Sequence, residues 1–523
     1  MTTLLGKTTT SRTTPPPSVA DAFRLVFGER VPVRFSAYDG SSTGAGDAPL
    51  RLELRTRRGL DYLLTSPNSL GLARAYLQGD LVLEPFDEGD PYEVLKFFED
   101  GLQPHRPTLS ELPELARFVR GHRPRVPELP KEETPGRVRR LAHGLTHGRA
   151  RDAEAIHHHY DVSNRFYELL LGPSMAYTCA VYPSADASLE TAQEEKFDLV
   201  CRKLGLRPGM RLLDVGCGWG GMVRHAVLNY GVTAIGVTLS EEQASWGAAR
   251  MEREGLADRG VIRHGDYRDV RESGFDAVSS IGLTEHVGVP NYPAYFRFLR
   301  NRLRDGGRLL NHCITRPDNQ HPGVPSRGFI NRYVFPDGGL TGSGTIVEVM
   351  EDEGFEVRHQ ENLREHYAMT TRDWCRNLSA NWDEAVAQAG LGVARVWGLY
   401  LAGSRLSFER NRIQLHQVLA SKTTAEGDSG FGLRPTWLSL PQIHQWSGAA
   451  APRIAVPRRG PALAAPGFVH TLPPGITCLF RPVSADDVEE MTHAAGQSGR
   501  RCSRPRSGGG PRPSGCPRWS GLL

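Results

Sequence analysis

The first residues that could carry chemistry form a glycine-rich turn at the end of an apolar run. Residues 212–221 read Leu-Leu-Asp-Val-Gly-Cys-Gly-Trp-Gly-Gly, a pattern typical of a strand that turns tightly into a helix. Glycines let the backbone pass close to a ligand, and the helix N-terminus beyond the turn favours negative charge. Gly216, Gly218 and Gly221 also satisfy the GxGxxG fingerprint of dinucleotide enzymes, so the turn alone does not identify the cofactor.

Two positions outside the turn favour S-adenosylmethionine over a nicotinamide dinucleotide. A nicotinamide enzyme requires an acidic residue about 20 positions further on, to hold the ribose hydroxyls. Residues 236–240 read Gly-Val-Thr-Leu-Ser there and contain no carboxylate. Asp214 ends the first strand instead, and Asp266 and Tyr267 follow a later one, where an acid and an aromatic ring can bind adenine.

The elements that must position these residues alternate between strands and helices. Short apolar stretches at 211–215, 233–239, 261–264, 277–281 and 307–311 are separated by helical segments. This alternation predicts an α/β fold, a Rossmann-like, doubly wound and mostly parallel sheet of the class I methyltransferase type.

The rest of the chain divides by composition. We predict a disordered tail (1–17), a small N-terminal α+β domain (18–90), a basic helical connector broken by prolines (91–155), a catalytic domain (156–422) and a low-order tail (423–523). Basic residues crowd residues 117–151. They form either a solvated linker or a surface for anionic lipid headgroups.

Composition limits the location and the partners of the protein. The net charge of +4 over 523 residues does not call for a nucleic-acid partner. The N-terminus has no apolar core typical of a signal peptide, and no apolar run is long enough to span a bilayer. The eight cysteines form no CxxC pair, and three consecutive histidines, His157 to His159, do not share a helix face. We therefore expect no metal site and a cytoplasmic protein.

Several ordered motifs between about 156 and 422 resemble the cyclopropane fatty acid synthases and the related mycolic acid methyltransferases. Besides the glycine turn, the matching runs are His158-His159-Tyr160-Asp161, Tyr177-Thr178-Cys179-Ala180, Asp266-Tyr267-Arg268-Asp269, Glu285-His286-Val287-Gly288, Tyr333-Val334-Phe335-Pro336 and Gln414-Leu415-His416. The resemblance implies an S-adenosylmethionine-dependent methyltransferase that acts on unsaturated phospholipid acyl chains at the membrane surface. It also implies that the protein is peripheral on the inner face of the membrane and that its N-terminal domain is lipid-associated.

The resemblance also implies site residues. A bicarbonate ion, the second cofactor, would be held by Cys179, Glu285, His312, the backbone of Ile314, and Tyr367. The positions expected to bind S-adenosylmethionine are Tyr177, Thr178, Asp214, Gly216, Gly218, Gly220, Thr238, Leu239, Gln243, Asp266, Tyr267 and Gly282.

The chemistry of methyl transfer to an alkene explains what these residues must do. An alkene is a weak nucleophile and a sulfonium methyl a strong electrophile, so the protein must mainly align them in a dry pocket. Methyl transfer leaves a carbocation, which needs a fixed base and the exclusion of water. Aromatic faces can stabilise the positive charge, and Tyr333 is a candidate.

Alternatives remain open at this point. If the base removes a proton from a chain carbon, the product is a 10-methylene branched acyl chain, and a reductase would be a partner. An RNA or small-molecule methyltransferase shares the fold, but the basic stretch lacks interleaved aromatics. A lipid-binding protein with a degenerate cofactor pocket is a further reading. A homodimer is also expected.

Overall fold

The computed structural model describes residues 15–29, 31–102, 104–105, 108–133, 162–320, 328–335, 339–435 and 437. All of these belong to one compact unit, and a second unit, residues 439–518, lies outside them. The runs around His158 and the basic residues from Arg137 to Arg151 also fall outside the described residues.

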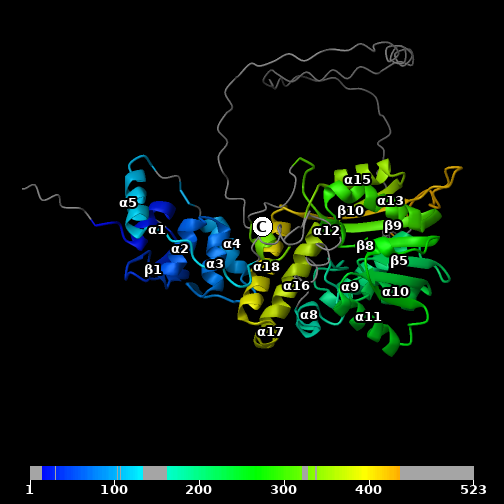
Figure 1. The fold of residues 1–523 in the computed structure, drawn as a ribbon, viewed down its shortest axis with the longest axis horizontal. Helices are drawn as coiled ribbons and strands as arrows, with labels where there is room; N and C mark the ends of the chain where they lie inside the picture. Colours follow the sequence, from blue (N-terminus) through cyan, green and yellow to red (C-terminus); the bar gives the residue numbers. More distant parts are fainter. Residues whose placement is uncertain are drawn as a thin grey trace, which may run out of the picture. The chain divides into compact units, whose positions relative to one another are not determined.

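The N-terminal part is built on a four-stranded sheet with the order β2-β1-β3-β4 (Figure 1). Its strands are β1 (Val33–Ala37), β2 (Ser42–Thr43), β3 (Leu50–Leu54) and β4 (Leu81–Glu84). The alternation of buried leucines and exposed polar residues in β3 places one face against helices α1 (Val19–Phe27), α2 (Arg57–Thr65) and α3 (Ser69–Leu77). Ser18 and Asp21 form a capping box that starts α1.

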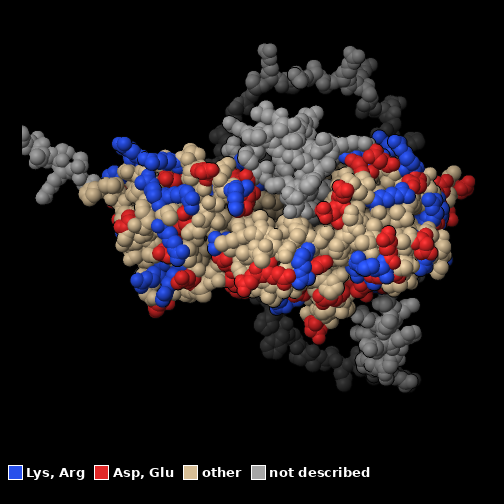
Figure 2. Space-filling view, turned by 60° about the horizontal axis from the view of Figure 1, so that its bottom comes forward, with Lys and Arg blue, Asp and Glu red and all other residues tan. Residues whose placement is uncertain are grey.

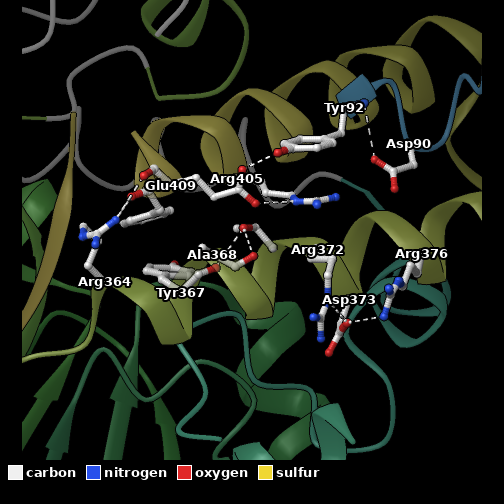
Figure 3. Close-up of polar contacts among 12 residues, drawn as sticks. Asp90, Tyr92, Arg364, Tyr367, Ala368, Arg372, Asp373, Arg376, Arg405 and Glu409 are labelled. Carbon is white, nitrogen blue, oxygen red and sulfur yellow. Dashed lines mark hydrogen bonds and ion pairs between the residues drawn. The ribbon is translucent and has the colours of Figure 1, made fainter. Parts of the chain in front are cut away.

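Helix α4 (Tyr92–Gly101), within the stretch 91–155, packs against the long helix α18 (Leu391–Glu409). The Tyr92 hydroxyl donates to Glu409, and the Arg405 guanidinium lies 3.4 Å from the centroid of the Tyr92 ring (Figure 3). Arg410 pairs with Asp100 at 2.6 Å. Helix α5 (Leu112–His122) contacts α1.

The rest of the described chain, from residue 162 onwards, contains a seven-stranded sheet with the order β10-β11-β9-β8-β5-β6-β7. The strands are β5 (Arg211–Val215), β6 (Thr233–Thr238), β7 (Gly260–His264), β8 (Phe275–Ile281), β9 (Leu303–Thr315), β10 (Glu356–Asn362) and β11 (Gln414–Ser421). Strands β5 to β9 pair in parallel, whereas β11 is antiparallel to both of its neighbours. The predicted α/β fold with a doubly wound, mostly parallel sheet is confirmed.

Helices cover both faces of this sheet (Figure 1). Apolar residues of α9 (Leu189–Leu204), α10 (Gly221–Tyr230) and α11 (Glu241–Arg253) form the core on one face. Those of α13 (Tyr292–Arg302) and α15 (Ser343–Asp352) form the core on the other. Helices α8 (Asn164–Leu171), α16 (Arg364–Ala380), α17 (Trp382–Ala389) and α18 pack together beside the sheet.

Three short elements complete the site region: α12 (Thr284–Val287), the 3₁₀ turn η1 (Tyr267–Asp269) and α14 (Phe329–Tyr333). Beyond β11, Trp437 is buried, and its carbonyl accepts a hydrogen bond from Arg202. Among the described residues, no helix combines the length and the apolar character that crossing a bilayer requires.

Candidate active site

The carboxyl ends of the parallel strands open onto a cavity of about 350 Å³. Strands β5, β6 and β8 end there, at the edge where doubly wound sheets bind ligands. Ten of the predicted cofactor positions line this first cavity: Tyr177, Thr178, Asp214, Gly216, Gly218, Thr238, Leu239, Gln243, Tyr267 and Gly282.

The glycine turn has the backbone geometry that only glycine adopts easily. Gly216 has a φ of +73°, and a Cβ at this position would lie 3.1 Å from the Leu283 Cβ. Gly220 has a φ of +80° and caps the N-terminus of α10. It does not line the cavity, because it faces Ile262, whose Cδ1 would lie 2.7 Å from an added Cβ. Gly220 therefore shapes the turn.

Asp214 places a buried carboxyl at the floor of the first cavity. Its Oδ1 accepts a hydrogen bond of 2.6 Å from the Ser279 hydroxyl on the adjacent strand β8. Burial raises the pKa of Asp214 to about 7. A carboxylate here can attract the cationic methionine end of S-adenosylmethionine.

Polar and aromatic groups surround the adenosine side. Thr238, at the end of β6, donates to the Gln243 Oε1 at 2.8 Å, and Ser240 caps α11 between them. Tyr267 lies edge-on to Phe298, with 5.4 Å between the ring centroids. Asp266 does not line the cavity, because its carboxylate accepts from the backbone and guanidinium of Arg268.

A second cavity of about 370 Å³ adjoins the first. Five residues line both cavities: Tyr177, Thr178, Gly282, His286 and Phe335. Much of the remaining wall is apolar or aromatic, with Ile330, Leu340, Tyr400, Phe408, Ile413 and Leu415. Four of the five predicted bicarbonate positions, Glu285, His312, Ile314 and Tyr367, also line it.

Glu285 extends from α12 towards the end of β9. Its Oε1 accepts a 2.7 Å hydrogen bond from the Ile314 backbone N–H. Its Oε2 is buried and has no hydrogen-bond partner among the described residues. Burial raises the pKa of Glu285 to about 7, so this oxygen can carry a proton at neutral pH.

His312 presents a second buried polar atom to the same cavity. Its Nδ1 lies 3.2 Å from the Gln417 amide nitrogen, and its Nε2 has no partner within the described part of the chain. Burial lowers the pKa of His312 well below its ordinary value, so the ring is neutral. Tyr367, on α16, stacks on Phe408 with 4.4 Å between ring centroids.

Two positions named from the sequence lie outside both cavities. Cys179 is buried, and its thiol donates to the Ala180 carbonyl at 3.1 Å. Burial raises the pKa of this thiol. The Tyr333 hydroxyl donates to Glu133 at 3.1 Å, and its ring lines neither cavity. The aromatic faces at the junction are instead those of Tyr177 and Phe335.

Sequence reasoning missed a buried lysine in the first cavity. Lys196, on α9, donates to the Thr178 hydroxyl at 3.0 Å, and burial lowers its pKa to about 7. It was missed because nothing in its sequence context distinguishes it from the surface lysines of an amphipathic helix.

The sheet order, the glycine turn and the buried Asp214 define a class I S-adenosylmethionine-dependent methyltransferase. Comparison with known families gives a match over residues 147–418 to the family described as mycolic acid cyclopropane synthetase. The chain belongs to this family, whose members are S-adenosylmethionine-dependent lipid methyltransferases.

Individual relatives agree with this assignment. The chain is 58% identical over 406 residues to the Mycobacterium tuberculosis protein named Probable fatty acid methyltransferase Rv3720, covering 78% of this chain and 95% of the relative. It is 39% identical over 400 residues to a Pseudomonas putida protein named Probable fatty acid methyltransferase, covering 76% and 93%. It is 36% identical over 269 residues to the cyclopropane-fatty-acyl-phospholipid synthase of Escherichia coli, covering 51% and 68%.

Proposed function

We propose that this enzyme transfers the methyl group of S-adenosylmethionine to the cis double bond of an unsaturated phospholipid acyl chain and closes a cyclopropane ring. The observation that carries the proposal is the pair of adjoining cavities, one lined by the glycine turn and the Asp214 carboxyl, the other mostly apolar and aromatic. An acyl chain in the second cavity would meet the transferred methyl only at the shared wall. Glu285 and His312 line the second cavity near this shared wall.

The residues of the first cavity fit the cofactor. The Asp214 carboxyl, the Thr238–Gln243 pair and the turn at Gly216 provide an anionic end, hydroxyl partners and a close backbone approach. S-adenosylmethionine supplies an electrophilic methyl group on a sulfonium. Binding at this edge of the sheet places that group towards Gly282 and Thr178, which line both cavities.

The walls of the second cavity suit a cationic intermediate. When an alkene carbon gains the methyl group, its neighbour becomes a carbocation, which water would capture. Apolar side chains exclude water, and the rings of Tyr177, Phe335 and Tyr400 offer π-faces for the positive charge. The Tyr177 hydroxyl donates to the Tyr400 hydroxyl at 2.9 Å.

Two unpartnered polar atoms fit a small anion at this wall. The Glu285 Oε2, protonated, and the His312 Nε2 can both donate to it. Bicarbonate held by Glu285, His312 and Tyr367 would supply a fixed base in an otherwise apolar cavity. The proton that must leave for ring closure comes from the transferred methyl, and the new carbon–carbon bond forms as it leaves.

Loss of a proton from a chain carbon instead would give a methylene-branched chain. The two relatives that align over three quarters of this chain are named fatty acid methyltransferases, which fits either product. The experiment must therefore resolve the product as well as the substrate.

A basic and apolar surface on α5 and the segments on either side of it supports access from a membrane. Lysine and arginine side chains gather over the N-terminal part of the molecule (Figure 2). On this surface Arg117, Arg120 and Arg123 are exposed, and Leu109 and Val126 are 88% and 87% exposed. Such a surface can bind anionic headgroups and insert aliphatic side chains.

The test is methyl transfer from labelled S-adenosylmethionine to vesicles of dioleoyl phospholipid. We expect each modified acyl chain to gain one CH₂ in mass, with proton NMR separating a ring from a methylene group. Glu285→Gln should bind the cofactor yet yield little modified lipid. If wild-type enzyme leaves every acyl mass unchanged, the proposal is wrong.

A further inference from the structure

A row of polar residues crosses three strands behind the second cavity, and all but Glu361, whose side chain is 35% exposed, are buried. Gln417 on β11 is the direct cross-strand partner of His312 on β9. Glu361 on β10 is the partner of Gln417 on its other side. Lys203, on α9, reaches this row with its amine, and its side chain is fully buried. Gln417 is likewise fully buried.

The hydrogen bonds of this row leave one orientation for the Gln417 amide. The Lys203 amine donates to the Gln417 Oε1 at 2.7 Å and also to Glu361. Burial lowers the pKa of Lys203, but its ion pair with Glu361 favours the ammonium form. Because an ammonium group only donates, the amide oxygen faces Lys203. The amide nitrogen therefore faces the His312 Nδ1, at 3.2 Å, and donates to it.

This orientation determines which nitrogen of His312 carries the proton. The ring is neutral, so it has a single N–H. Since Nδ1 accepts from Gln417, the proton resides on Nε2. Nε2 is the buried atom that has no partner among the described residues, and His312 lines the second cavity.

We infer that Gln417 and Lys203 are positioning residues that hold His312 as the Nε2–H tautomer, so that the second cavity presents a fixed N–H donor to a small anion. The inference rests on the proposed function, which places bicarbonate beside His312. An apolar residue at 203 would cover the sheet without the cost of burying an amine. The amine orients the amide, and the amide orients the ring.

The experiment that tests this inference reverses the direction of the hydrogen bond between residue 417 and the His312 Nδ1. In Gln417→Glu, the carboxylate can still accept from Lys203 but can only accept from His312. The neutral ring must then place its proton on Nδ1, and Nε2 loses its N–H. Gln417→Met, which removes both bonds, is the second variant should the first fail to fold. Gln414→Glu, the same substitution on the same strand but on the exposed hydrogen bond to Asn411, is the matched control.

The first readout is the ¹⁵N signal of the His312 ring in histidine-labelled enzyme, titrated with sodium bicarbonate. Wild type and Gln414→Glu should show the proton on Nε2 and respond to bicarbonate. Gln417→Glu should show the proton on Nδ1 when the ring is neutral and bind bicarbonate at least about tenfold more weakly, as expected for a lost bond to a charged group. The affinity for S-adenosylmethionine, measured by calorimetry, should be the same in Gln414→Glu and Gln417→Glu as in wild type.

The pH dependence separates positioning from packing. In Gln417→Glu the Nε2 carries a proton only in the imidazolium form, so the ratio of wild-type to variant affinity for bicarbonate should increase as pH rises. A packing defect would weaken binding equally at every pH and would overturn the inference. An unchanged ring tautomer, or unchanged bicarbonate affinity, in Gln417→Glu would also overturn it.

If wild-type enzyme leaves every acyl mass unchanged, the proposed function itself is wrong, and this outcome is read separately from the His312 signal. If wild-type enzyme methylates lipid while its His312 signal ignores bicarbonate, the anion assignment is wrong and the positioning role falls with it. If wild type responds to bicarbonate and Gln417→Glu responds identically, only the positioning role is wrong.

Discussion

Glu285 should make the stability of this enzyme depend on pH in a way that one substitution abolishes. Burial raises the pKa of Glu285 to about 7, against an ordinary value of 4.5. Between these values the folded protein holds a proton that the unfolded chain has released. The free energy of unfolding therefore falls as pH rises, by about 1.4 kcal/mol per pH unit. Full stability is present below about pH 4.5, and about 3 kcal/mol is lost by pH 7 and above.

Glu285→Gln replaces the carboxyl group with an amide of similar shape that cannot ionise, so the variant loses this titration. We expect the difference in unfolding free energy between wild type and variant to shift by about 3 kcal/mol in favour of the variant between about pH 5 and about pH 8. Urea denaturation at several pH values measures it. Glu348→Gln, at an exposed position of α15, is the control and should follow wild type. Parallel pH curves for wild type and Glu285→Gln would refute the assignment of a protonated, buried carboxyl.

Three further predictions address the cofactor and the membrane. Asp214→Asn should weaken S-adenosylmethionine binding about tenfold or more, because a charge-assisted contact is lost; calorimetry that gives an unchanged affinity would exclude Asp214 from the site. Gly216→Ala should lower stability by about 1–2 kcal/mol through its left-handed backbone and also weaken cofactor binding, whereas Gly209→Ala, with a φ of +85° and open space around it, should lose only stability. Replacing Arg117, Arg120 and Arg123 together with Glu should reduce binding to anionic vesicles about tenfold or more, measured by sedimentation against Arg253→Glu on α11; equal binding would place the membrane contact elsewhere.

The parallel half of the sheet could be predicted from the sequence because burial on both faces leaves a direct signal. Strands β5 to β9 are short apolar runs, and all five were located to within a few residues. Strand β10 was missed because it lies at the edge of the sheet, and residues 356–362 carry charged or polar side chains at most positions. Strand β11 was recognised only as a motif, Gln414-Leu415-His416, and its pairing with β9 depends on contacts about 100 residues apart.

The site residues also differ in whether the local sequence or contacts between distant segments determine them. Positions that depend on local turn geometry, such as Gly216 and Gly282, lie where the motif places them. Cys179 and Asp266 follow from motifs too, but side-chain direction decides their role, and the structure turns both away from the cavities. Lys196 and Gln417 could not be found, because their burial results from packing between α9 and distant strands.

The antiparallel insertion of β11 gives the site a property that a purely parallel sheet would lack. In antiparallel pairing, residues directly opposite bring their side chains close together on one face. The register therefore places Gln417 beside His312. On β9, the His312 side chain lines the second cavity, and the Ile314 backbone N–H donates to Glu285. The cofactor edge is shaped by strand ends and glycines, whereas the wall that would hold the anion is shaped by cross-strand pairs. Substitutions of Gln417, which faces His312 across the sheet, should accordingly alter proton removal and leave cofactor binding intact, whereas substitutions in the glycine turn should do the reverse.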